Sequence, residues 1–261
     1  MSRMIQNILQ FSKWKSIKDE DITLAVLPWG ATEAHNMHLP YGTDTIFAEY
    51  ISAKAVQKAT NLNRTNSCMT VLPSVAYGVN TGQMDVKLCM NLNPSTQLAI
   101  LNDILQVLQK HNIKKLVIIN GHGGNLFQPI IRELSLKYTD ILITTINWWV
   151  VCKGDDYFKE QGDHAGELET ACMMAIHPEL VLPLSEAGEG KEKRLKIRGF
   201  REKWAWTPRR WIFASTDTGI GNPAAADPLI GKRFLDDVIA KIAEFLNDFA
   251  STEKEQDLYE S

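Results

Sequence analysis

The sequence has few cysteines and no long apolar run. Its four cysteines, Cys68, Cys89, Cys152 and Cys172, include no C-x-x-C pair, so their spacing indicates neither a zinc ribbon nor a disulfide framework. We expect buried thiols. No window reaches the roughly 18 apolar residues that a membrane span requires, and the N-terminal stretch is too polar for a signal peptide. We therefore expect a cytoplasmic protein with no membrane partner.

The sequence also lacks an excess of charge of either sign. It has 28 Lys and Arg against 31 Asp and Glu, a formal net charge of -3, so it has no general attraction for nucleic acid. Its 261 residues, 44% of them hydrophobic, are enough to bury a large core. We expect one domain over residues 1–261, with a polar tail at about 250–261, and no nucleic-acid partner.

One segment departs from this balance. Residues 186–212 contain nine Lys or Arg between positions 191 and 210, together with Trp204, Trp206 and Trp211. Basic and aromatic side chains together can bind nucleic acid, but one such segment is weak support for that function. A subunit contact, or a loop that closes over an anionic substrate, is the favoured interpretation.

Apolar runs typical of buried strands alternate with segments of helical periodicity. The expected strands are 22–28, 68–78, 114–120 and 140–150, and the expected helices are 44–60, 94–112, 125–138, 164–176 and 228–250. This alternation predicts an α/β fold with a mostly parallel sheet flanked by helices. In such sheets ligands collect where strands end and helices begin.

The first polar motif follows the first expected strand. The stretch "WGATEAHNMHLPYGTDT" contains Glu33, His35, His38 and Asp44. Alternate residues of an extended segment point to the same side, so Glu33 and His35 can face one cavity. Carboxylates and imidazoles are ligands for Zn²⁺, Mn²⁺ and Fe²⁺. Taken alone, however, the stretch also fits a hydrogen-bonded polar turn.

Two further motifs lie at later junctions. "NGHGGN" places His122 directly after the third expected strand, where a glycine-rich turn or a phosphate loop is the alternative, although the G-K-[ST] ending is absent. "DHAGELET" opens the fourth expected helix, where His164 and Glu167 are three residues apart and share a face. Glu169 points elsewhere and is expected to support the ligands. The alternative is that Glu167 only complements the helix dipole.

The three motifs together predict a metal site. The candidate ligands are Glu33, His35, Asp44, His122 and Glu167. Five are too many for one tetrahedral catalytic zinc that must also hold water. They suit two divalent ions, roughly 3.5–4 Å apart, that share a carboxylate.

With these residues assembled, the sequence resembles the creatininase, or creatinine amidohydrolase, family of metal-dependent hydrolases. The resemblance rests on "LPWGATEAHNMHLPYGTDT", "NGHGGN" and "DHAGELET", with weaker support from "GIGNPAAADPLIGK". It covers roughly residues 20–245. It implies a three-layer α/β fold, a homo-oligomer that is commonly a hexamer, and two divalent ions per subunit.

The resemblance also implies residue roles. Glu33 and His122 would bind one ion, His35 the other, and Asp44 would bridge them. His164 matches the histidine that acts on the substrate, and its expected role is to stabilise the oxyanion or protonate the leaving nitrogen. Glu167 would be a ligand, a general base, or both in turn.

The sequence departs from the pattern of creatininase itself at three places. Gly124 stands where creatininase has a glutamate, and Glu167 can supply the missing carboxylate. Asn36 and Met37 replace a small residue and a proline, and loop 78–93 lacks the usual histidine and Phe-Pro-Gly stretch. Creatinine is therefore not the expected substrate.

We expect a small-molecule hydrolase that cleaves a non-peptide C–N bond of an amide or cyclic amide. The alternatives are a metal-dependent hydrolase of keto-sugars or keto-cyclitols and, less favoured, a metal-stabilised binding protein without turnover. The set of five ligand-type side chains plus His164 favours an enzyme, because structural metal sites usually fill their coordination sphere with protein groups.

Overall fold

The computed structural model describes residues 7–62, 68–160, 162–253 and 255–260. Within these residues, four parallel strands form a sheet in the order β2-β1-β3-β4. They are β1 (Ile22–Trp29), β2 (Cys68–Val71), β3 (Lys115–Asn120) and β4 (Leu142–Asn147). Trp29 of β1 pairs with Asn120 of β3, which pairs with Asn147 of β4, so three strands end level with one another.

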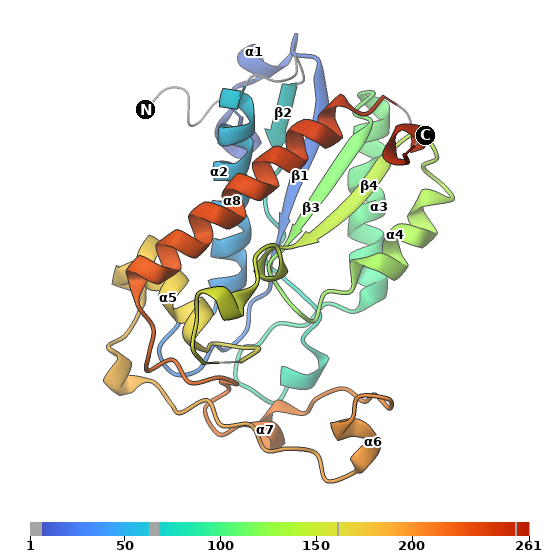
Figure 1. Cartoon of the computed structure of the whole chain (residues 1–261). Helices are drawn as coiled ribbons and strands as arrows, with labels where there is room; N and C mark the ends of the chain where they lie inside the picture. The colour runs from blue at the N-terminus through green and yellow to red at the C-terminus, as the bar shows by residue number, and fades with distance from the viewer. Residues whose placement is uncertain (1–6, 63–67, 161, 254, 261) are drawn as a thin grey trace.

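The long helices lie on both faces of the sheet (Figure 1). One face is covered by α2 (Thr43–Leu62), α5 (Glu167–Ile176) and α8 (Pro228–Ser251), and the other by α3 (Pro94–Lys110) and α4 (Phe127–Ser135). This arrangement confirms the expected three-layer α/β fold.

Shorter helices lie in the connections, before β1 and after α8. The one-turn α-helices are α1 (Trp14–Ile17), α6 (Arg198–Arg201) and α7 (Trp211–Ala214). The 3₁₀ turns are η1 (Leu9–Phe11), η2 (Thr81–Gln83), η3 (Trp148–Val150), η4 (Gly154–Asp156), η5 (Pro178–Leu180), η6 (Leu184–Glu186) and η7 (Glu255–Leu258). Within the described ranges, no helix is both long and apolar enough to cross a bilayer.

The strands are buried on both sides. In β1, Leu24 and Val26 pack into the core under α2, α5 and α8, while Ala25 and Leu27 pack against α3 and α4. A strand buried on both faces needs apolar side chains at every position, which is why the central strands read as continuous apolar runs.

Several expected elements are shorter than predicted, and two of them bear on the site. The strand expected at 68–78 ends at Val71, and beyond it Val75 and Gly78 make only isolated bridges, to Trp29 and Asn91. Pro73, between Val71 and Val75, has no N–H to donate to a ladder. The helix expected from His164 begins at Glu167. The other expected elements are present with shifted ends.

Candidate metal centre

The predicted histidine and carboxylate motifs meet at the carboxyl ends of the strands. Glu33 and His35 lie in the loop after β1, Asp44 lies in the first turn of α2, and His122 follows β3 by two residues. His164 precedes α5. All five side chains are buried. This is the edge of the sheet at which a parallel α/β fold presents its ligand-binding loops.

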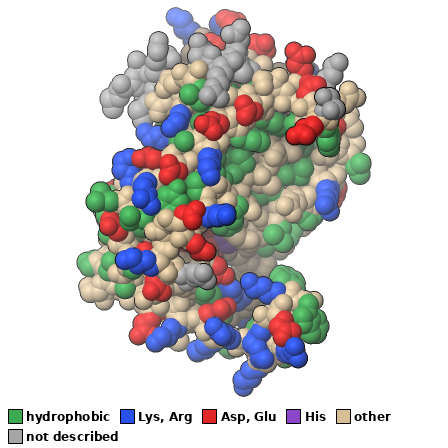
Figure 2. Space-filling view, in the orientation of Figure 1, with side chains coloured by type: hydrophobic (Ala, Val, Ile, Leu, Met, Phe, Trp, Pro, Cys, Tyr) green, Lys and Arg blue, Asp and Glu red, His purple; other side chains and the backbone are tan. Residues whose placement is uncertain are grey.

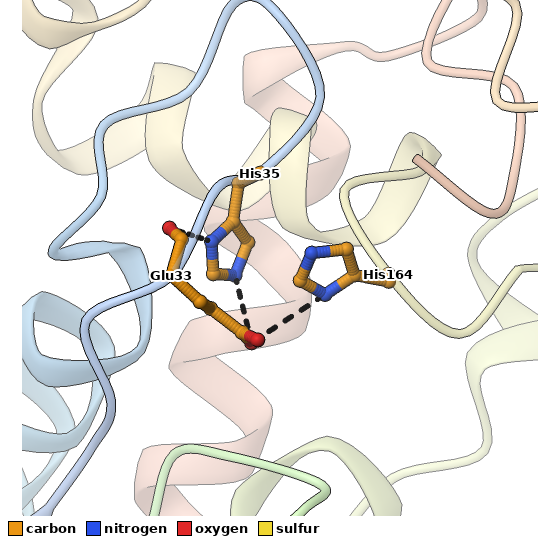
Figure 3. A group of neighbouring side chains, drawn as sticks. All are labelled: Glu33, His35 and His164. Carbon is orange, nitrogen blue, oxygen red and sulfur yellow. Dashed lines mark hydrogen bonds and ion pairs between the residues drawn. The ribbon is translucent and has the colours of Figure 1, made fainter. Parts of the chain in front are cut away.

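The Glu33 carboxylate lies among three imidazoles. Its Oε1 is 2.9 Å from His122 Nδ1, 3.7 Å from His164 Nδ1 and 4.0 Å from His35 Nε2. Figure 3 shows this carboxylate pointing toward the rings of His35 and His164. One oxygen atom therefore faces side chains from three different segments.

Asp44 lies between two of these histidines. Its Oδ1 is 3.0 Å from His35 Nε2, and its Oδ2 is 3.1 Å from His122 Nδ1. Although it is buried, Oδ2 has no partner of good hydrogen-bond geometry among the described residues. A buried carboxylate oxygen left in this condition is costly unless a cation is bound to it.

The far nitrogen of each imidazole is held by a backbone carbonyl. His35 Nδ1 is 3.1 Å from Glu33 O, His122 Nε2 is 3.1 Å from Val79 O, and His164 Nε2 is 2.8 Å from Ala34 O. In a neutral imidazole, a nitrogen that donates to a carbonyl leaves the other nitrogen as an unprotonated acceptor. These second nitrogens all face the carboxylates, which is the usual arrangement of metal-binding histidines.

The buried carboxylates raise the proton affinity of the imidazoles. Burial alone lowers the pKa of His35, but Asp44, Glu169 and Glu33 outweigh it and raise this pKa to about 10. Burial likewise opposes Glu33 and Asp44 at His122, whose pKa still rises well above 6.5. The two histidines in turn lower the pKa of Asp44 against the effect of its burial. The cluster thus favours positive charge, which protons or metal ions can supply.

The structure brings Glu169, not Glu167, to this cluster. Glu169 Oε1 is 3.9 Å from His35 Nε2, and its other oxygen accepts the N–H of Ala165. Glu167 Oε2 instead accepts the N–H groups of Lys159 and Glu160 at 2.9 and 2.7 Å. The glutamate beside the cluster is therefore the one that was expected to point elsewhere.

The start of α5 explains this difference. His164 and Glu167 would share a face only if both lay on one helix, but His164 precedes α5 and exchanges backbone hydrogen bonds with Ile220. Ala165 follows with a φ of 51°, a left-handed conformation that breaks helical periodicity. Counting three residues from His164 therefore does not predict which side chains share a face.

The atoms fit a metal centre. Three groups, each with ligand atoms within 4.8 Å of one another, are Glu33–His35–His164, Glu33–Asp44–His122 and His35–Asp44–Glu169. Carboxylate oxygens and neutral imidazole nitrogens are ligands for Zn²⁺, Mn²⁺ and Fe²⁺ alike. The first two groups share Glu33, and the last two share Asp44.

Neither Gln83 nor the place of Glu169 is predicted from the sequence. Gln83, in η2, is buried and donates through Nε2 to Glu33 Oε2. It lies in loop 78–93, which departs from the creatininase pattern. That departure indicates an unusual loop, but it does not single out Gln83. The four cysteines are free, and Cys152 and Cys172 are buried as expected, whereas Cys68 and Cys89 are only partly buried.

The basic, tryptophan-containing segment lies beside the cluster. The Trp211 ring packs edge-on against His164, with centroids 4.6 Å apart, and Arg209 pairs with Asp163 at 2.8 Å. Figure 2 shows Lys and Arg side chains gathered at this end of the molecule, with a hollow between the segment and the body. The segment therefore contributes to the surroundings of His164.

Fold and cluster together define an α/β enzyme with a carboxylate–histidine centre at the ends of its parallel strands. The chain belongs to the creatininase family, because the family model described as "Creatinine amidohydrolase" matches residues 10–246. It is accordingly a hydrolase, as the resemblance implied.

Relatives with three different names match the chain. A mycofactocin precursor peptide peptidase from Mycobacterium ulcerans (strain Agy99) is 26% identical, covering 90% of this chain and 87% of its own. A 2-amino-5-formylamino-6-ribosylaminopyrimidin-4(3H)-one 5'-monophosphate deformylase from Methanothermobacter marburgensis is 26% identical over 80% and 83%. Creatinine amidohydrolase from Pseudomonas putida is 24% identical over 60% and 65%.

Solved structures agree with the family assignment. A protein from Bacteroides fragilis NCTC 9343, which carries the proposed name creatinine amidohydrolase, is 40% identical with a TM-score of 0.90, covering 98% of this chain and 99% of its own. A structure named "Creatininase Mn" has a TM-score of 0.78 at 19% identity, covering 94% and 99%. Another creatininase variant is described as Zn-Zn type.

Proposed function

We propose that the chain is an amidohydrolase with two divalent ions, Zn²⁺, Mn²⁺ or Fe²⁺, at the strand ends. The observation that carries this proposal is the orientation of the three imidazoles, each tied by its far nitrogen to a carbonyl and directed by its near nitrogen at shared carboxylates. Glu33 and His122 would hold one ion, and His35 and Glu169 the other. Asp44 would bridge them, since its two oxygens lie beside different histidines.

His164 is the proposed proton carrier. When bound, the two ions would acidify a water molecule and polarise the substrate carbonyl. Because His164 Nε2 donates to Ala34 O, only Nδ1 is available on the side of the cluster. His164 can therefore accept a proton at Nδ1 and pass it to the leaving nitrogen.

We propose that the substrate is an amide or cyclic amide of a small metabolite. Peptidase, deformylase and amidohydrolase are all names for cleavage of an acyl–nitrogen bond, and the relatives carry all three. The departures at Gly124 and in loop 78–93 argue against creatinine itself. This shared chemistry supports the type of bond that is cleaved. Because the relatives act on different substrates by name, the groups on either side of that bond are to be found by experiment.

Metal content tests the site. Wild-type protein should contain about two divalent ions per chain. A Glu33→Ala, His122→Ala double variant should lose the ion that these two residues hold and bind the other more weakly, because the two ions share Asp44. His164→Asn should keep its metal and lose most of its activity. Unchanged metal in the double variant would refute the assignment, and loss of metal in His164→Asn would make His164 a ligand.

A substrate panel tests the reaction. Formamides, lactams, short peptides and keto-sugars should be assayed with each of the three metals, and turnover is expected with an amide. Turnover of ketones alone would refute the amidohydrolase proposal. Metal binding without any turnover, with His164→Asn indistinguishable from wild type, would favour a binding protein.

A further inference from the structure

Gln83 lies in loop 78–93, and its side chain is fully buried. Among the residues that the structure describes, it is the one side chain of this loop that hydrogen-bonds the side chain of a proposed ligand. It is 1% exposed, and its Nε2 donates to Glu33 Oε2. The other oxygen of the same carboxylate, Oε1, faces the three imidazoles. A donor fixed on Oε2 therefore determines the direction of Oε1.

The orientation of the Gln83 amide is itself fixed. Its Oε1 accepts the S–H of Cys89 at 3.2 Å, and the Cys89 sulfur accepts the N–H of Ala34 at 3.2 Å. A flipped amide would direct its oxygen at the Glu33 carboxylate and its N–H₂ at the thiol. Burial raises the pKa of the Cys89 thiol, so at neutral pH the sulfur carries the proton that it donates.

The same loop supports both proposed ligands of one ion. Val79 O holds His122 Nε2, and Gln83 holds Glu33. Across the loop, Asn80 Nδ2 donates to Met90 O at 3.1 Å, and a side chain added at Gly82 would lie 1.8 Å from the Arg209 carbonyl. The loop is thus tied across itself by a hydrogen bond and packed against the tryptophan-containing segment, and Gln83 has little room to move away from Glu33.

We propose that Gln83 is a positioning residue that holds Glu33 for the ion shared with His122, and that Cys89 sets the orientation of its amide. The inference rests on the proposed two-metal function. Partners that hydrogen-bond a ligating carboxylate typically change metal affinity by roughly 10- to 100-fold. Within the described part of the chain, the Gln83 side chain bonds Glu33 and Cys89 but neither His35 nor Glu169, so one ion should be affected more than the other.

Metal affinity tests this proposal. Each variant would be titrated with Zn²⁺ or Co²⁺ in competition with a chromophoric chelator. Gln83→Met keeps the volume and removes the donor, and it should weaken one of two ions by roughly 10- to 100-fold. Cys89→Ala should act in the same direction, whereas Cys89→Ser should retain near wild-type affinity because a hydroxyl also donates and accepts.

The Gln83→Met, Cys89→Ala double variant tests the connection between the two residues. If Cys89 acts only through Gln83, the double variant should bind metal no more weakly than Gln83→Met alone. Additive losses would overturn the role given to Cys89. The Cys89→Ala and Cys89→Ser pair keeps the test decisive if Gln83→Met does not fold.

Two variants distant from the site serve as matched controls. Cys68→Ala removes a partly buried thiol beside Glu20, and Asn247→Leu removes a buried amide that donates to carbonyls of α2 and α8. Both should bind metal like wild type. Wild-type affinity in Gln83→Met and in Cys89→Ala would overturn the inference, whereas absence of metal from wild-type protein would instead refute the proposed function.

Discussion

Glu167 and Glu169 are two residues apart, and their carboxylates have different partners. Two backbone N–H groups occupy Glu167 Oε2, while Glu169 Oε1 faces His35. A carboxylate whose oxygen already accepts two hydrogen bonds is less available to a cation than one with an oxygen directed into a cluster of ligand atoms. Both glutamates lie in α5, and the left-handed Ala165 just before the helix separates them from the backbone direction of His164.

Substitution of each glutamate by glutamine should separate their roles. Glu169→Gln should lower affinity for one metal ion by at least about 10-fold, because the neutral amide is a poorer ligand than a carboxylate. Glu167→Gln should leave metal content unchanged after dialysis against the same chelator. The opposite pattern would restore the assignment made from spacing.

The sequence predicts most residues of the cluster but not all. Glu33, His35, Asp44, His122 and His164 stand in motifs next to buried strands or at a helix start, and the parallel sheet brings these junctions together. Glu169 was missed because no glycine or asparagine at position 165 signals the left-handed turn. Gln83 was missed because it is 50 residues from Glu33 and lies in a loop with no periodic pattern.

At the scale of elements, the connection between α5 and α8 is held by polar side chains. Asp217 accepts hydrogen bonds from Ser215 Oγ at 2.7 Å, Gly219 N at 3.0 Å and Gly190 N at 2.9 Å. Asn36, one of the departures from the family pattern, bonds both backbone groups of Gly188. These hydrogen bonds link residues of the connection to one another and link the connection to the first motif. The pattern of expected helices and strands does not predict them.

Asp217 should make the stability of this connection depend on pH. Burial raises the pKa of Asp217, but the hydrogen bonds from Ser215, Gly190 and Gly219 outweigh it and lower the pKa. The stabilisation is therefore present above the unfolded value of about 3.9 and is lost as pH falls through the lower folded value. Asp217→Asn should reduce the free energy of unfolding at pH 7 by about 1–3 kcal/mol.

Urea unfolding at several pH values measures this effect. The difference in the free energy of unfolding between wild type and Asp217→Asn should be constant from pH 7 to 5 and should become smaller toward pH 3. Asp236→Asn, which removes an exposed ion pair with Lys232, is the control and should change stability by less than about 1 kcal/mol. A difference that persists unchanged at pH 3 would contradict the role of the ionised carboxylate.

At the scale of the whole molecule, one end carries both the site and a group of exposed aromatic and basic side chains. Trp204 and Trp206 are 74% and 81% exposed, while Trp211 of the same segment packs on His164. Large exposed tryptophans are typical of contact surfaces. The single domain and the homo-oligomer expected from the sequence remain predictions, and the family match over residues 10–246 supports the first.

The mass in solution tests the predicted assembly. Light scattering should give a multiple of the 29.4 kDa chain, with six chains as the expected number. Replacing Trp204 and Trp206 by serine should shift the mass toward smaller species if the segment is a subunit contact. A monomeric wild-type protein would contradict the predicted oligomer. An unchanged mass in the variant would mean that the tryptophan-containing segment is not a subunit contact and contributes only to the surroundings of the site.

The three imidazoles are anchored by the carbonyl groups of Glu33, Ala34 and Val79. A carbonyl is common to every amino acid, so no exchange of side chains at positions 34 and 79 deletes these acceptors. Single substitutions can alter the anchors only by moving the backbone, and mutational scanning of positions 34 and 79 should therefore underestimate how much the centre depends on them. Deleting or lengthening the loops by one residue would expose that dependence.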